Sequence, residues 1–127
     1  MLRLPWKRGP VDAAGRLYVI ATRFVYRNRR DLPMVFVHGL LMRARWDGIE
    51  GAAGVFLGAD ARARATYTVS AWRAESDLRA WLRSPAHARV ARAYGARMES
   101  SLHLGWEMEA FEERLAWREG MERLGMR

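Results

Sequence analysis

The stretch of residues 66–98 constrains the fold most, because its hydrophobic pattern changes period within one continuous segment. Residues 66–72 alternate, with Tyr67 and Val69 on one side, as a pleated strand requires. From Glu75 onward the apolar residues recur at steps of three and four, which is typical of one face of a helix. The segment therefore predicts a strand that leads directly into a helix.

The dipeptide Ser84-Pro85 divides that helix. Serine is a preferred N-cap residue and proline a preferred first helical residue, so the pair predicts that a new helix begins there. His87 then lies in the first turn, where the positive end of the helix dipole disfavours imidazolium. Because a neutral imidazole can accept a proton or ligate a metal, His87 is our first candidate for a catalytic residue.

The rest of the chain is expected to supply three further strands and two further helices. They are predicted over residues 16–26 (strand), 33–46 (helix), 48–58 (a glycine-rich, bulged strand), 100–108 (strand) and 110–124 (helix).

Residues 33–46 are the most ambiguous of these elements. The run 35–37 (Val-Phe-Val) is typical of a strand, whereas Val37, Leu40 and Leu41 recur at helical spacing. We predict a helix. Its apolar residues nearly encircle it, which implies contacts on more than one side.

In this order the elements form the split βαβ, or ferredoxin-like, arrangement, an α+β fold with an antiparallel sheet and an extra C-terminal helix. At 127 residues the chain is expected to form one domain. We assign residues 16–127 to it. Residues 1–15, where prolines and glycines interrupt every period, are predicted to be a loosely held N-terminal lead-in that Trp6 pins to the domain.

Both faces of the predicted strand 16–26 are largely apolar. Val19 and Ala21 point one way, and Tyr18 and Ile20 point the other. Both faces of the sheet therefore need cover. Since the two helices of a ferredoxin-like domain pack on one face, we expect the other to be bare, and we predict that a second copy of the chain covers it in a homodimer.

The formal charge of +8 comes almost entirely from arginine, because Lys7 is the only lysine. Such a charge suits nucleic-acid binding. The arginines, however, are spread over the helices among acids, and no nucleic-acid-binding motif accompanies them, so a nucleic-acid partner is not our main expectation. The longest apolar stretch, residues 34–42, is too short to span a bilayer, and we expect no membrane partner.

Cysteine is absent, which excludes disulfides and thiolate chemistry and favours a cytoplasmic location. The chain also has no glutamine and a single asparagine, Asn28. Few labile residues with abundant arginine are typical of a thermophile, and a GC-rich genome gives the same arginine bias.

Several short motifs carry a resemblance to a known group. They are residues 67–72 (Tyr-Thr-Val-Ser-Ala-Trp), Asp77-Leu78, Trp81, Ser84-Pro85-Ala86-His87, Asp31-Leu32-Pro33 ahead of His38, and Leu115-Ala116-Trp117. Together they resemble the dimeric α+β barrel superfamily, which includes the antibiotic-biosynthesis monooxygenases. The likeness covers most of residues 16–124 and is nearest to uncharacterised members and to a region shared with spheroidene monooxygenase.

This resemblance implies two ferredoxin-like subunits that pack their open sheet faces into a barrel. Members of the group include cofactor-independent oxygenases, haem enzymes and small-molecule binders. The chain does not match a complete set of the Asn, Trp and His residues that the best-studied monooxygenases use. The sequence requires no cofactor and leaves a histidine-ligated haem as an open alternative.

Four further residues are candidates for ligand binding. Trp72 ends its strand beside the helix start and is expected to wall a cavity, Tyr18 and Thr22 share a strand face and offer hydroxyls, and His38 lies in the middle of its helix. His103 alternates out of the apolar face of its strand and is expected to be structural or exposed. The three histidines lack the close spacing of a zinc site, so no metal site is predicted.

These features predict a homodimeric α+β barrel that binds a small, largely apolar molecule near His87, Trp72 and His38. A monooxygenase-like reaction is the candidate activity, with His87 as general base or ligand anchor and Trp72 shaping the pocket. Two alternatives stay open: an interaction or scaffold dimer without catalysis, and weak nucleic-acid binding through the basic surface.

Overall fold

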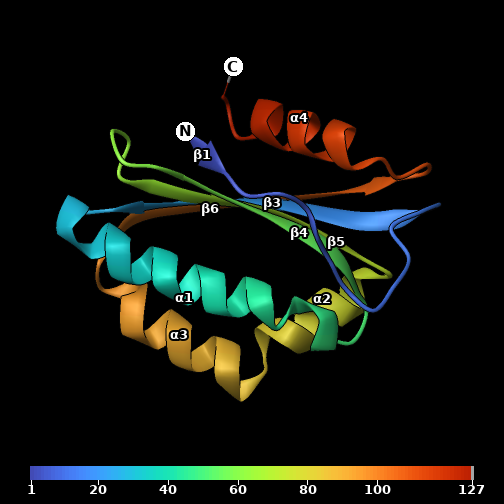
Figure 1. Cartoon of the computed structure of the whole chain (residues 1–127), viewed down its shortest axis with the longest axis horizontal. Coiled ribbons are helices and arrows are strands. Elements are labelled where there is room, and N and C mark those ends of the chain that lie inside the picture. Colours follow the sequence, from blue (N-terminus) through green and yellow to red (C-terminus); the bar gives the residue numbers. More distant parts are fainter. Residues whose placement is uncertain (127) are drawn as a thin grey trace.

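Within residues 1–126, the part of the chain that the computed structural model describes, six strands form one sheet and helices cover both of its faces (Figure 1). Residue 127, the predicted end of the domain, lies outside the described residues. The elements are β1 (Leu2–Arg3), β2 (Lys7–Arg8), β3 (Leu17–Tyr26), α1 (Leu32–Ala44), β4 (Ala52–Asp60), β5 (Ala65–Trp72), α2 (Glu75–Leu82), α3 (Pro85–Gly95), β6 (Met98–Met108) and α4 (Glu113–Arg123). None of the helices in this range is long and apolar enough to cross a membrane.

The strands run antiparallel in the order β1-β4-β5-β3-β6, and β2 also pairs with β4. The four long strands thus have the ferredoxin-like order, with β5 and β3 at the centre and α1 and the α2–α3 pair as the two crossovers. The predicted α+β fold is confirmed, and α1 confirms the choice of a helix for residues 33–46.

Local sequence signals explain two irregular points. Ser84 caps α3, because its Oγ accepts the backbone N–H of His87 at 3.3 Å while Pro85 begins the helix. The register of β4 against β5 shifts between Ala52 and Gly54, which is the predicted bulge in the glycine-rich strand. Both predictions from the sequence are confirmed.

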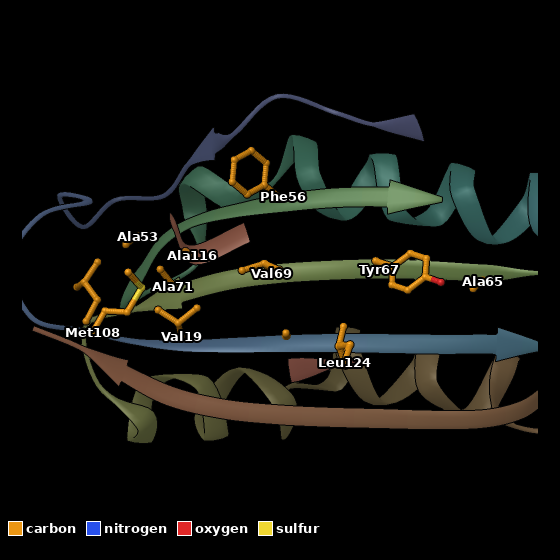
Figure 2. Close-up of a cluster of buried hydrophobic side chains, with 12 residues drawn as sticks. Val19, Ala53, Phe56, Ala65, Tyr67, Val69, Ala71, Met108, Ala116 and Leu124 are labelled. Atoms are coloured by element: carbon orange, nitrogen blue, oxygen red, sulfur yellow. The ribbon is translucent and has the colours of Figure 1, made fainter. Parts of the chain in front are cut away.

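The last helix, α4, lies on the face of the sheet opposite to α1, α2 and α3 (Figure 1). The sequence predicted this face to be bare, and that prediction is wrong. Val19, Ala21, Val69 and Ala71 point to this face and have no exposed surface (0%). Figure 2 shows Val19 on β3 beside Val69 and Ala71 on β5, inside the cluster that α4 closes.

Small residues let α4 approach the sheet closely. An ideal Cβ at Gly120 would lie 2.9 Å from Val69 Cγ2 and 3.2 Å from Ala21 Cβ. Ala116, one helical turn earlier, is also fully buried. The pattern of large apolar residues did not show this contact, because its central members on α4 are alanine and glycine.

The covered face changes the argument for a dimer. The sequence called for a second copy because apolar side chains needed cover, and the chain's own α4 and N-terminal segment provide it. The homodimer itself stays a prediction, but burial of this face no longer supports it.

The N-terminal segment is tied to the edge of the sheet instead of being loosely held. Leu2–Arg3 and Lys7–Arg8 pair with β4. The ring centroid of Trp6 lies 4.9 Å from that of Phe56 and 5.4 Å from that of Phe111. Trp6 therefore pins the segment, as predicted.

Candidate functional site

The candidate site lies on the other face of the sheet, toward α2 and α3. Tyr18 and Thr22 point to this face, because they alternate along β3 with Val19 and Ala21, which point to α4. β6 pairs with β3 so that His103 lies opposite Thr22. Polar side chains thus occupy positions that alanine and valine hold on the α4 side.

His87 is half-buried at the start of α3. Its ring centroid lies 4.6 Å from that of Trp81. Burial lowers the pKa of His87 below its ordinary value and outweighs a hydrogen bond with the backbone of Leu82, which raises the pKa. A positive charge on His103 lowers the pKa of His87 further. The imidazole is therefore neutral near pH 7 and is able to accept a proton.

His103 is exposed, as the sequence analysis expected, and it also contacts Thr22. Its Nδ1 lies 3.2 Å from Thr22 Oγ1, and its ring meets that of Phe24 edge-on with centroids 5.4 Å apart. Partial burial of the ring lowers the pKa of His103 as well. The signal that was missed is the register of β3 against β6, which pairs two polar residues on one face.

Three tryptophans form a packed cluster behind His87. The ring centroid of Trp72 lies 5.4 Å from that of Trp46 and 5.6 Å from that of Trp81. Trp72 is wholly buried, and its Nε1–H donates to Ser70 Oγ at 2.9 Å. Trp72 is thus part of the core and supports Trp81, which is the tryptophan that contacts His87.

The side chain of Tyr18 extends from β3 to β6, where its hydroxyl lies next to Gly105. Any Cβ at Gly105 would collide with the Tyr18 hydroxyl, so the ring position depends on a glycine there. Burial, followed by the negative charge of Glu75, raises the pKa of Tyr18 above its ordinary value. The hydroxyl therefore keeps its proton at neutral pH and is able to donate a hydrogen bond.

The structure places His38 apart from His87. The His38 ring meets that of Tyr94 edge-on, with centroids 5.2 Å apart. Tyr94 lies seven residues after His87, roughly two helical turns along α3. Of the residues that the sequence singled out, Tyr18 and Thr22 lie on this face of β3, His87 lies at the start of α3, and His38 contacts Tyr94 toward the other end of α3.

Two surface hollows lie elsewhere. One of about 420 Å³ is lined by Trp6, Arg8, Gly9, Val11, Asp12, Ala13 and Glu113. The other, of about 280 Å³, is lined by Leu2, Arg29, Leu32, Pro33, Phe36, Ala59 and Ala61. Neither is lined by the candidate site residues. Among residues 1–126, no three His, Asp or Glu side chains are grouped so that they could hold a metal ion.

Comparison with solved structures supports the fold. A candidate monooxygenase from Fusobacterium nucleatum matches with a TM-score of 0.66 at 10% identity, over 84% of this chain and 48% of that one. A mutant of SnoaB, a cofactor-independent oxygenase from Streptomyces nogalater, matches with a TM-score of 0.55 at 18% identity, over 71% and 90%. An uncharacterised ferredoxin-fold protein from Listeria monocytogenes that is related to antibiotic-biosynthesis monooxygenases matches with a TM-score of 0.58 at 12% identity, over 86% and 62%.

The chain has the ferredoxin-like fold of antibiotic-biosynthesis-monooxygenase-like proteins. It spans about half the length of the Fusobacterium protein, with 48% of that chain covered. No family model and no curated protein matches the sequence. The likeness is therefore one of fold.

Proposed function

We propose that this chain binds a small, largely apolar molecule between α3 and the sheet and acts on it as a monooxygenase-like enzyme. The observation that supports this most is His87, whose half-buried ring packs against Trp81 and whose pKa burial lowers. A neutral base beside an aromatic wall suits a ligand with an apolar ring and one acidic O–H or C–H group.

In this proposal His87 accepts the proton of the ligand. The hydroxyl of Thr22 and the ring of His103, which lie 3.2 Å apart, orient its polar end. Trp81 and Phe24, each in ring contact with one of the two histidines, pack against its apolar part. An ionised phenol or enol is electron-rich, which is the form that dioxygen oxidises.

α3 is the element that opens to admit the ligand. Of its residues only His87, Ala88 and Tyr94 are not exposed. A helix with so few buried contacts opens at a low cost in free energy. Displacement of α3 therefore uncovers the buried Thr22 beside His103, which is already exposed, and leaves the tryptophan cluster intact.

The structural neighbours support the class of reaction at the level of fold alone. SnoaB is a cofactor-independent oxygenase, and the Listeria protein is related to antibiotic-biosynthesis monooxygenases. The proposal requires no resident cofactor. A Soret band in the absorbance of the purified protein would instead assign a haem.

The test uses 1-naphthol, a small apolar ring with one acidic hydroxyl, and measures its binding by fluorescence and its turnover by oxygen uptake. His87→Ala is expected to weaken binding about three- to tenfold and to slow oxygen uptake about a hundredfold or more. His38→Ala is the control and is expected to leave both unchanged. A His87→Ala variant that binds and turns over like the wild type would remove His87 from the site.

A second candidate function is that of an interaction protein without catalysis. It is favoured by large apolar side chains that stay exposed on α1, among them Met34 and Leu41. The homodimer, the cytoplasmic location and the thermophilic source stay predictions from the sequence. Light scattering of the purified chain is the direct test of the first.

A further inference from the structure

The outer surface of the helix layer is unusually apolar. Met34, Val37 and Leu41 on α1 are 54%, 47% and 51% exposed, at the three- and four-residue spacing of a helical stripe. Leu82 at the end of α2 and Val90 on α3 are also exposed large hydrophobic residues. The sequence predicted contacts on more than one side of α1, and α1 does contact β3 through Val35 and α3 through His38, while Met34, Val37 and Leu41 stay exposed.

The positive charge of the protein is concentrated in this layer. Residues 29–48, around α1, contain four arginines and two aspartates, and residues 75–98, which span α2 and α3, contain five arginines, one glutamate and one aspartate. These segments hold five of the eight net positive charges, since the rest of the chain has thirteen basic and ten acidic residues. Arg79 pairs with Glu75 and Arg97 with Asp31, so the excess positive charge lies on the other arginines of the layer.

Several of these arginines are exposed and lack an acidic partner. Arg30 and Arg45 lie just before and just after α1, Arg83 lies between α2 and α3, and Arg89 and Arg92 lie along α3; all five are exposed. Among residues 1–126 none of the five forms an ion pair.

The surface of α4, on the opposite side of the sheet, differs in charge. Arg114, Arg118 and Arg123 alternate there with four glutamates, Glu112, Glu113, Glu119 and Glu122. Glu119 and Arg123 form an ion pair. Figure 1 shows α4 on the opposite side of the sheet from α1 and α3. The basic and apolar side chains of α1 and α3 therefore lie on the other side of the molecule from the mixed charges of α4.

The combination of charge and apolarity selects among possible occupants. If α1 packed against α1 of a second copy, Arg30 and Arg45 at the two ends of the helix would each lie next to an arginine of that copy. This holds for both parallel and antiparallel packing, and the like charges would repel. A nucleic-acid backbone would pair with the arginines but would leave Met34, Val37 and Leu41 without apolar partners. An anionic lipid surface satisfies both groups, since headgroups attract arginine and the acyl boundary takes aliphatic side chains.

We propose that the outer surface of α1 and α3 binds the surface of an anionic lipid membrane, with α1 lying parallel to the membrane plane. The sequence set membranes aside because no segment is long enough to span one, but an interfacial contact requires no span. This inference does not depend on chemistry at His87, and a His87→Ala variant is expected to bind lipid like the wild type.

The experiment is co-sedimentation of the full chain with vesicles of phosphatidylcholine alone or mixed with phosphatidylglycerol. Binding is expected only with the anionic vesicles and is expected to weaken as salt is added. Arg89→Glu with Arg92→Glu is expected to lower the vesicle partition coefficient about tenfold or more. Val37→Ser with Leu41→Ser is expected to lower it about tenfold by removing apolar contact.

A charge-matched control separates this surface from net charge. Arg114→Glu with Arg118→Glu makes the same charge change on α4 and is expected to retain most of the binding. Equal losses in both arginine pairs would overturn the proposal, as would failure of the wild type to bind anionic vesicles. Two further results would overturn it. In the first, the Val37 and Leu41 variant binds vesicles like the wild type and differs from it only in the mass measured by light scattering. In the second, the α1 variant and the Arg89 and Arg92 variant both lose DNA binding but still bind vesicles.

Discussion

The two faces of the sheet are packed according to different principles. On the α4 side, small residues such as Ala21, Ala116 and Gly120 bring the helix and sheet close together, and the side chains are buried completely. On the side of α2 and α3, the buried Thr22 contacts His103, whose side chain is exposed, and α3 itself is mostly exposed. The first arrangement suits stability and the second suits binding, because polar groups and a movable cover are costly to keep without a function.

The comparison has one exception, the tryptophan cluster at the end of the second face. Trp46 is 1% exposed and packs against Trp72 and Trp81. This end is as tightly packed as the α4 side. The region proposed to open is therefore confined to α3 and β6, with a rigid aromatic support next to it.

The largest predicted effect on stability tests whether the tryptophan cluster is a rigid support. Trp46→Ala is expected to lower the free energy of unfolding by about 3–5 kcal/mol, because it leaves a large cavity among aromatic rings. Urea unfolding followed by circular dichroism measures this effect. A loss below about 1 kcal/mol would show that the cluster adjusts freely and is no rigid support.

Phenylalanine variants sharpen the same test. The Trp46 Nε1–H is buried without a hydrogen-bond partner among residues 1–126, whereas the Trp72 Nε1–H donates to Ser70. Trp46→Phe therefore loses only volume, and Trp72→Phe also leaves the Ser70 hydroxyl unpaired. We expect Trp72→Phe to be the more destabilising by about 1 kcal/mol.

The second effect tests the close contact on the α4 side. Gly120→Val places a branched side chain where a Cβ already approaches Val69 Cγ2 at 2.9 Å, so we expect a loss of about 1–3 kcal/mol from overpacking. The variant is also expected to bind a hydrophobic dye, because a displaced α4 uncovers the sheet. Gly95→Val is the control: it makes the same change near the end of another helix, where a Cβ would meet nothing within 4 Å, and it should be nearly neutral.

The sequence predicted the fold better than it predicted the faces. Periodicity and the Ser84-Pro85 break are local signals, and α1, α2, α3 and the four long strands followed them. The face chosen by α4 depends on Ala116 and Gly120, whose lack of side-chain bulk gives no hydrophobic periodicity. A close contact between small residues can be recognised only when the structure of the surface that packs against them is known.

The candidate site was predictable in part for a related reason. The position of His87 in a capped first helical turn was predictable because its signal lies within four consecutive residues. The contact of His103 with Thr22 was missed because the two residues are 81 apart in the sequence and meet only through the strand register. Trp72 was correctly placed next to the helix start, but sequence alone did not show that Trp81 lies between it and His87.

The third effect is the pH dependence of stability that arises from the two histidines on the side of α2 and α3. Burial lowers the pKa of His87 and His103 below their ordinary value of 6.5, so the unfolded chain binds protons more readily than the folded one. Stability is therefore expected to fall as the pH drops below about 6.5, and to level off once both histidines are protonated in the folded state. Above that pH both are neutral in either state and contribute no slope.

Glutamine variants assign this slope. His87→Gln and His103→Gln should each remove part of the loss of stability between about pH 7.5 and pH 5, and the double variant should remove most of it. Urea unfolding at a series of pH values provides the measurement. If the slope persisted in the double variant, the acid sensitivity would come from the carboxylates and would say nothing about this face.

The smallest effect is expected on the outer surface of α1, which packs against neither face of the sheet. Val37 and Leu41 are about half exposed and point away from the sheet, so Val37→Ser with Leu41→Ser should change the free energy of unfolding by no more than about 0.5 kcal/mol. Val35→Ser, on the same helix but only 8% exposed, should cost about 2 kcal/mol or more, because it places a hydroxyl in an apolar cluster. A stripe that is apolar yet contributes nothing to folding has to be explained by something outside the chain. A large loss of stability in the Val37 and Leu41 variant would instead make the stripe part of the fold and remove the reason to look for an outside partner.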